Sequence, residues 1–223
     1  MRSIATRAAV ALALLGATCA TAAGPAEWRF AALLDGTQIG THRFELRSGA
    51  SDTNLRELRS VALFEVKVLG LVVYRYRHRA EEQWRGDCLA SMTAHTDDDG
   101  RVTEVSGRAI PAAFVLDVRA AESGSPVQPP EATRGDCLMS FAYWNPRLAR
   151  QSRLLDPGTG RVETVTITDA PATTLQLRGK QVTARGVRIS GLTHPIDVWY
   201  VGDEWVGLDT TVGSGRRLSY RPL

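Results

Sequence analysis

Four histidines are the side chains of this chain best suited to acid–base or nucleophilic chemistry: His42, His78, His95 and His194. A catalytic triad needs a nucleophile, a base within reach and a group that orients the base. None of the four lies in a nucleophile-elbow pattern, since the sequence contains no Gly-x-Ser-x-Gly. The sequence therefore predicts no catalytic residue. A hydrolase in which His78 or His42 meets carboxylates across strands ranks third among the functional hypotheses.

One local cluster has the residue types of a metal site, the run His95-Thr96-Asp97-Asp98-Asp99. Consecutive Asp residues before a Gly are typical of a hairpin turn. The run also lacks the ligand spacing of a calcium loop. We therefore expect no metal ion and no cofactor.

Three arginines, Arg75, Arg77 and Arg79, alternate along one segment and so share one face of a strand. Such a row could bind an anionic head group or a phosphate. It is also typical of a solvated sheet face with acidic cross-strand partners, here Glu65 or Glu81. The second interpretation is favoured.

Large aromatic side chains lie near the ends of the expected strands or in the segment that follows Cys137. If the sheet curls around a groove, they could line a pocket for an apolar ligand. The alternative is that they fill the core, which is the usual place of such side chains. The candidate ligand-binding residues are Tyr74, Tyr76, His78, Trp84, Tyr143, Trp144 and Trp199.

Short alternating segments separated by Gly, Asp and Pro must position these residues. Asp35-Gly36 and the Asp97–Gly100 run each separate two alternating segments, and Gly202-Asp203-Glu204 separates two more. Turn residues between alternating runs indicate β-hairpins. In 72–79 the alternation is clearest: Val72, Tyr74, Tyr76 and His78 share one face.

About twelve strand candidates and little helix signal predict an all-β fold. We expect a single antiparallel curved sheet, half-barrel or barrel-like, with at most one or two short helices. The best helix candidate runs from Asn145-Pro146 to Gln151, where Asn can cap and Pro occupies the first helical position. Residues 123–133 are rich in Pro and Ser and predict an exposed loop, which is also a candidate domain boundary.

The N-terminus has the three parts of a secretory signal. Arg2 and Arg7 precede an uncharged apolar run at 8–17, and Thr21-Ala22-Ala23 offers a cleavage site before Gly24. Cleavage after Ala22 also satisfies the small-residue rule. The run is too short to span a bilayer. We therefore expect a signal peptide at 1–23 and one β-rich domain at 24–223.

Cys19 lies inside this signal segment. A lipid anchor there is the minor interpretation, because no large aliphatic residue lies three places upstream. Loss of residues 1–23 removes two Arg and no acid, so the net charge falls from +3 to +1. Without a run of Lys or Arg we expect no nucleic-acid partner. No later segment is apolar enough for a transmembrane helix.

Two cysteines follow the signal, Cys88 and Cys137, each after a Gly-Asp pair. An even pair in an exported protein predicts a disulfide, because the periplasm and the exterior are oxidising. A reactive thiol pair is disfavoured, since Cys-x-x-Cys spacing is absent. The bridge would cross the segment 123–133, which argues for one domain.

Several segments in this order resemble a family of exported bacterial proteins classed only as a domain of unknown function. They are Leu34–His42, Val73–His78, Trp84–Leu89, Cys137–Pro146, Leu154–Pro157 and Ile196–Tyr200. The resemblance implies a periplasmic β protein and supplies no activity. A looser likeness of size and strand pattern is to periplasmic lipoprotein carriers, whose curved sheet cradles acyl chains.

The leading hypothesis is a periplasmic, non-catalytic binding or carrier domain for an apolar or lipid-like ligand. The alternative is an interaction or assembly protein of the cell envelope, which would use a sheet edge or the arginine row to bind a partner. The leading hypothesis rests on the aromatic residues, the predicted disulfide and the lack of a catalytic constellation. Fold-level likeness alone cannot name a ligand.

Overall fold

The computed structural model describes residues 26–48, 54–120, 131–135, 137–213 and 215–223. The signal segment 1–23 with Cys19 lies outside the described residues, as do residues 123–130 of the expected loop. None of the helices in the described part of the chain is long and apolar enough to cross a membrane.

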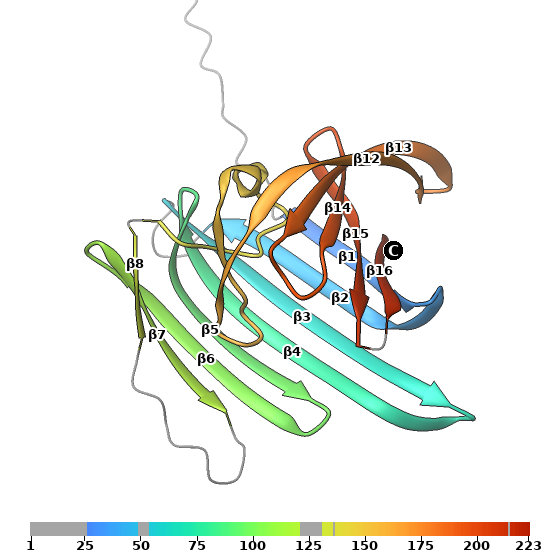
Figure 1. Ribbon diagram of the computed structural model, residues 1–223, viewed down its shortest axis with the longest axis horizontal. Helices are drawn as coiled ribbons and strands as arrows, with labels where there is room; N and C mark the ends of the chain where they lie inside the picture. The colour runs from blue at the N-terminus through green and yellow to red at the C-terminus, as the bar shows by residue number, and fades with distance from the viewer. Residues whose placement is uncertain (1–25, 49–53, 121–130, 136, 214) are drawn as a thin grey trace, which may run out of the picture.

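Thirteen strands form one sheet in which every neighbouring pair is antiparallel (Figure 1). The order is β12-β13-β14-β15-β16-β1-β2-β3-β4-β5-β6-β7-β8. No pairing joins β12 to β8 within the described residues, so the sheet is open. Figure 1 shows that it is also curved. The predicted all-β fold with a single curved antiparallel sheet is confirmed.

The strands of this sheet are bounded as follows. They are β1 (Ala26–Leu34), β2 (Thr37–Ser48), β3 (Leu55–Val68), β4 (Leu71–Arg85), β5 (Cys88–Asp98), β6 (Arg101–Ile110), β7 (Ala113–Ala120), β8 (Glu131–Arg134), β12 (Thr166–Leu177), β13 (Lys180–Ser190), β14 (Ile196–Val201), β15 (Glu204–Val212) and β16 (Arg216–Pro222).

Strand β4 shows how the sequence pattern sets the two faces of the sheet. Tyr74 and Tyr76 are half-buried and His78 is buried, whereas Arg75 and Arg77 are exposed. Successive side chains of a strand point to opposite faces, so the alternation predicted from the sequence is the alternation observed. The inner face of β4 is therefore the aromatic one.

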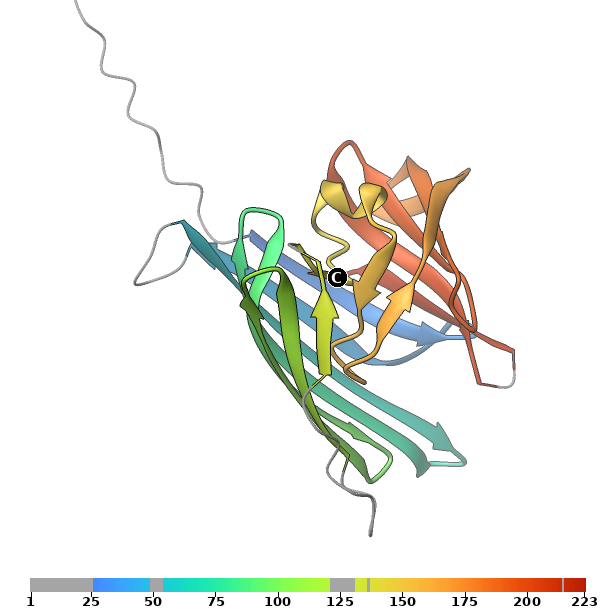
Figure 2. The ribbon, with the colours of Figure 1, turned by 60° about the vertical axis from the view of Figure 1, so that its left-hand side comes forward.

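A second, three-stranded sheet lies on the concave face of the large one. It consists of β9 (Met139–Ser140), β10 (Arg153–Leu155) and β11 (Val162–Thr164), with the 3₁₀ helix η1 (Pro146–Arg150) between β9 and β10. We call residues 137–165 the insert. Figure 2 shows it in yellow and light orange, between the green strands β5–β7 and the red strands β14–β16.

The insert fills much of the curved sheet with apolar side chains. Its Met139, Leu154 and Leu155 are fully buried, in the same core cluster as Trp84 and Trp205 of the large sheet. Burial of this apolar surface is the main favourable term that holds the insert in place. The concave side is therefore mostly core.

The helix prediction at 145–151 is confirmed as one short 3₁₀ helix. Asn145 caps it, and its Oδ1 accepts a hydrogen bond from the backbone N–H of Arg147 at 2.9 Å. Pro146 occupies the first turn, where its missing N–H costs nothing.

The loop prediction was wrong at its C-terminal end. Residues 131–133 belong to strand β8 and are not loop, because pairing with β7, as at Phe114 with Thr133, covers an otherwise open sheet edge. Strands β11 and β12 follow each other closely but belong to different sheets, and the chain passes from one to the other at Val165. Val165 is buried and its N–H donates to the carbonyl of Ser152 at 2.9 Å.

Candidate functional site

A hollow of about 620 Å³ lies where the β1–β2 hairpin ends beside β3. We call it the hairpin notch. Its apolar wall is formed by Leu34, Ile39, Phe64, Val66 and Tyr76, and charged side chains also line it: Glu65, Lys67, Arg77 and Arg216. Its volume falls within the range of small-molecule sites.

Tyr76 belongs to the wall of two hollows. Besides the notch it lines a smaller space of about 230 Å³ with Thr96, Asp98 and Asp156. Its ring stacks on Phe64 with centroids 5.4 Å apart. Burial is the main reason why the pKa of Tyr76 is raised far above its ordinary value, so the phenol is neutral. Of the candidate ligand-binding residues, Tyr76 is thus placed at an accessible hollow.

Its neighbours on β4 are held by hydrogen bonds to β5. The Tyr74 hydroxyl donates to Asp98 Oδ1 at 2.7 Å, and His78 Nδ1 lies 2.9 Å from Thr96 Oγ1. His78 is buried, and this burial lowers its pKa, against the opposing charge of Asp156. These two candidates flank Tyr76 on the same strand face.

Trp84, Tyr143 and Trp144 pack into the contact between the insert and the large sheet. Trp84 is fully buried and meets Trp144 edge to face at 5.3 Å. Tyr143 is half-buried, with its ring 5.2 Å from that of Trp205. These rings hold the insert to the sheet, so a ligand could reach Trp84 or Trp144 only by displacing it.

Trp199 lies in a separate core cluster with Leu175, Ala184 and Val206. Its indole Nε1 donates to Asp209 Oδ2 at 2.7 Å. The structure therefore places Trp199 away from the other candidates. The sequence could not show this, since residue type alone does not reveal which side of a curved sheet a strand residue occupies.

His42 is the centre of a polar chain across three strands. Its Nε2 lies 2.7 Å from Ser60 Oγ and its Nδ1 lies 3.0 Å from the Tyr220 hydroxyl. Burial, and next the nearby His78, hold the pKa of His42 well below its ordinary value, so the ring is neutral. Ser60 is buried and both ring nitrogens are engaged. This arrangement links β2, β3 and β16, and the sequence did not pair these residues.

Glu82 is a buried carboxylate that the sequence analysis did not single out. Its Oε2 accepts hydrogen bonds from Trp84 Nε1 at 2.9 Å and from Ser140 Oγ at 3.2 Å, so it joins β4 to the insert. Burial raises its pKa to about 7, although both hydrogen bonds oppose the shift. Its place in the alternation, in step with His78 and Trp84, was the signal that could have found it.

Replacing Glu82 by Gln is expected to stabilise the protein more at pH 8 than at pH 5. The change in the free energy of unfolding that the substitution causes should be about 2 kcal/mol more favourable at pH 8. Folded Glu82 keeps its proton up to about pH 7, whereas the unfolded chain releases it near the ordinary pKa of 4.5. Wild-type stability therefore falls as the pH rises through this window, and Gln removes that loss. Urea unfolding at both pH values measures it.

The control for this experiment is Glu81→Gln on the outer face. Glu81 is exposed and pairs only across the surface with Arg59, at 3.8 Å. Exposed ion pairs contribute little, so this variant should leave the free energy of unfolding nearly unchanged. The same stability difference for Glu82→Gln at both pH values would contradict the assignment of a raised pKa.

The outer face of the sheet carries the arginine row and a broad charged hollow. Arg75 pairs with Glu65 at 3.3 Å and Arg77 with Asp97 at 3.8 Å, which agrees with the favoured interpretation of a solvated face. The hollow measures about 900 Å³ and crosses β2 to β7, with residues of both signs along it.

The acidic hairpin tip at 97–99 is occupied by turn contacts. Asp97 Oδ1 accepts from the Gly100 N–H at 2.7 Å, and Asp98 pairs with Arg101 at 3.2 Å. Among the described residues no group of three or more His, Cys, Asp or Glu side chains is arranged to hold a metal ion.

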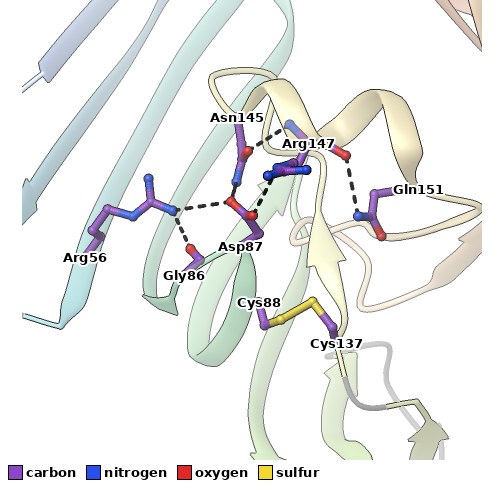
Figure 3. Close-up of a disulfide and its surroundings, with 8 residues drawn as sticks. All are labelled: Arg56, Gly86, Asp87, Cys88, Cys137, Asn145, Arg147 and Gln151. Carbon is purple, nitrogen blue, oxygen red and sulfur yellow. Dashed lines mark hydrogen bonds and ion pairs between the residues drawn. A yellow bond between two sulfur atoms is a disulfide. The ribbon is translucent and has the colours of Figure 1, made fainter.

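The disulfide between Cys88 and Cys137 ties the β4–β5 turn to the insert (Figure 3). Beside it, Asp87 Oδ1 accepts from Asn145 Nδ2 at 3.2 Å and Asp87 Oδ2 pairs with Arg147 at 3.5 Å. The N–H of Leu89 donates to the carbonyl of Leu138 at 2.9 Å. The start of the insert is thus fixed covalently and by polar contacts.

Fold and site together define an open, curved all-β protein whose concave face is filled by its own insert. Its hairpin notch lies beside the end of the β1–β2 hairpin. The chain belongs to the family described as Domain of unknown function (DUF6134), whose model matches residues 30–223. The resemblance to a domain of unknown function is thereby confirmed, and it brings no activity with it.

A solved structure shares the fold. The chain is similar to the crystal structure of a beta-barrel-like protein of domain of unknown function DUF1849 from Brucella abortus. The two are 10% identical, the match covers 90% of this chain and 96% of that one, and the TM-score is 0.60. At this identity the likeness concerns the fold alone. A comparison with curated proteins gave no match.

Proposed function

We propose that the protein is an exported, non-catalytic binding protein that holds an apolar or lipid-like molecule in the hairpin notch. The observation that carries the proposal is the apolar wall of the notch, where Ile39, Val66 and Tyr76 are half-buried and can lose further surface to a ligand. Apolar surface removed from water contributes about 25 cal/mol per Å².

The charged side chains of the notch suit a ligand with an anionic head group. Three are basic, Lys67, Arg77 and Arg216, and one is acidic, Glu65. Each basic residue already has an acidic partner at the surface, such as Asp35 at 2.7 Å from Arg216. Exposed ion pairs are weak, so a carboxylate or phosphate can compete for these cations.

Export to the periplasm is part of the same proposal. It is supported by the signal pattern of residues 1–23 and by the disulfide, which persists in oxidising compartments. A single domain over 24–223 is likewise proposed, since strands before and after the segment 123–133 share one sheet.

Mass spectrometry of protein purified gently from the periplasm tests the proposal, first under native conditions and then after solvent extraction. We expect a stoichiometric lipid or fatty acid in the native spectrum. A clean ligand-free mass would contradict the carrier function. It would favour the alternative of an envelope protein that binds a partner, for which the charged hollow of the outer face is the best surface.

Replacing Ile39 by Asp is expected to weaken binding of a dansyl-labelled fatty acid by at least about tenfold. The variant removes an apolar wall group and sets a carboxylate against an apolar chain and an anionic head. Fluorescence titration measures the affinity, and circular dichroism checks that the sheet is intact. Ile110→Asp is the matched control, since Ile110 is exposed at another hairpin end. Equal affinities of the two variants for the fatty acid would show that it does not bind in the notch.

A further inference from the structure

The β3–β4 hairpin projects beyond both of its neighbouring strands (Figure 1). Its pairing with β2 stops at Gly40 opposite Phe64, and its pairing with β5 begins only at Tyr76 opposite Asp98. Residues 65–75 therefore form a two-stranded ribbon whose edges are open up to Arg75, where the carbonyl accepts from the N–H of Asp99 at 2.8 Å. We call it the β3–β4 ribbon.

The end of this ribbon is apolar on every side. Seven large apolar side chains are exposed in the described residues, and five of them lie between 63 and 73. The exposed fraction is 99% for Leu69 in the turn and 72% for Leu71. Val68 and Val73 are more than half exposed, and Val66 and Val72 are half-buried. Contiguous exposed apolar surface of this kind marks an interaction site.

Leu69 is also an unfavourable residue for its turn. Leu69-Gly70 is a two-residue turn with φ of 52° and 82°, and three other hairpins of the sheet make the same turn. Two of these have Asp at the first position, Asp35 and Asp99, and the third has Arg178, which pairs with Glu204. A left-handed conformation favours Asn or Asp and disfavours Leu. The folded chain thus gains nothing from Leu69, which points to a role outside it.

The chain segment that continues from the tip into β4 is basic. From residue 66 to residue 80 the chain contains Lys67, Arg75, Arg77 and Arg79 and no acid. Tyr74 lies in the same region. Tyr, Lys and Arg behind an apolar tip are the residues found where a protein enters a lipid surface. Four acids lie beside these four bases, Glu65 at the base of the ribbon and Asp97, Asp98 and Asp99 in the β5–β6 hairpin, so the folded region behind the tip carries both signs in equal number.

We propose that the tip of the β3–β4 ribbon inserts into a lipid membrane surface. A protein partner would cover one face of the ribbon, whereas here both faces and the turn are apolar, as suits immersion in a lipid phase. Gly70 to Val72 spans about 7 Å at roughly 3.3 Å per residue, within the depth reached by interfacial segments, and Lys67 lies opposite Val72 at the base of this tip. Basic side chains and Tyr74 then lie at the head groups.

Insertion would also bring the hairpin notch to the membrane, because Val66 and Lys67 belong to the ribbon and line the notch. The insertion does not require that the notch holds a ligand. The two proposals can therefore fail separately.

The test is co-sedimentation of the processed full chain with vesicles of phosphatidylethanolamine and phosphatidylglycerol, using the variant Leu69→Asn. Asn-Gly suits this turn better than Leu-Gly, so the variant should melt at an equal or higher temperature. We expect it to bind the vesicles at least about tenfold more weakly than the wild type. Both proteins have the same N-terminus, so the difference in binding reports on residue 69.

Leu223→Asn is the matched control, because Leu223 is an exposed leucine outside the ribbon, at the C-terminus. It should bind vesicles like the wild type. Wild-type protein that stays in the supernatant would overturn the proposal, as would equal binding by Leu69→Asn. Self-association that depends on Leu69 and occurs without vesicle binding would also overturn it, and would make the ribbon a protein contact.

Discussion

Replacing both Cys88 and Cys137 by serine is expected to lower the free energy of unfolding by about 4 kcal/mol. The bridge joins residues 49 apart in sequence. In the chain-entropy model, closing such a loop removes conformational freedom mainly from the unfolded state. The unfolded double variant should therefore be more expanded and its denaturant slope steeper. Urea unfolding of the oxidised wild type and the variant measures both quantities.

The folded variant should keep its native structure. Asp87 still contacts Asn145 and Arg147, and Leu89 still hydrogen-bonds to Leu138. Wild-type protein reduced with dithiothreitol is the control, and its stability should match that of the variant. A loss below about 1 kcal/mol would mean that the bridge constrains the unfolded chain far less than its loop length implies.

The sequence was informative wherever the structure depends on local pattern. Period-two alternation predicted which β4 residues share a face, and Asp-Gly pairs predicted hairpins at Asp35-Gly36 and Asp99-Gly100. An even pair of cysteines after the expected signal segment predicted the disulfide. Each of these features is determined by neighbouring residues or by compartment chemistry.

The candidate site depends on long-range geometry, which no local pattern contains. Aromatic type selected Trp84, Trp144 and Trp199, but the curl of the sheet and the insert bury all three. The notch arises because β2 pairs with β3 only as far as Gly40 opposite Phe64, while β3 continues to Val68. The sequence does not show this register. Leu69 was overlooked because Leu-Gly is not a usual signal for this turn.

Replacing Asp209 by Ala is expected to lower the free energy of unfolding by about 3–4 kcal/mol. Asp209 is buried and accepts hydrogen bonds from Trp199 Nε1 at 2.7 Å and from Arg221 Nη2 at 2.8 Å. Ser219 and Arg217 bind it as well, so one carboxylate joins β14, β15 and β16. Alanine would leave a buried indole N–H and the arginine charges without their acceptor.

The pH dependence of this contribution has a defined sign. Burial alone would raise the pKa of Asp209, but hydrogen bonds from Ser219 and Arg217 and the charge of Arg221 lower it below its ordinary value of 3.8. The stabilisation is therefore fully present above about pH 4 and is lost as the pH falls through the lower folded value. The difference in the free energy of unfolding between the wild type and Asp209→Ala should therefore become smaller below about pH 4.

Asp197→Ala is the matched control, because Asp197 lies opposite Asp209 on β14 and pairs at the surface with Arg188, at 2.7 Å. It should cost less than about 1 kcal/mol. If Asp209→Ala cost no more than this, the Trp199 indole would not depend on its carboxylate partner, and Trp199 would regain its place among the ligand-binding candidates. A large and acid-sensitive loss instead makes Trp199 a structural residue, which leaves Tyr76 and the hairpin notch as the site to test for a ligand.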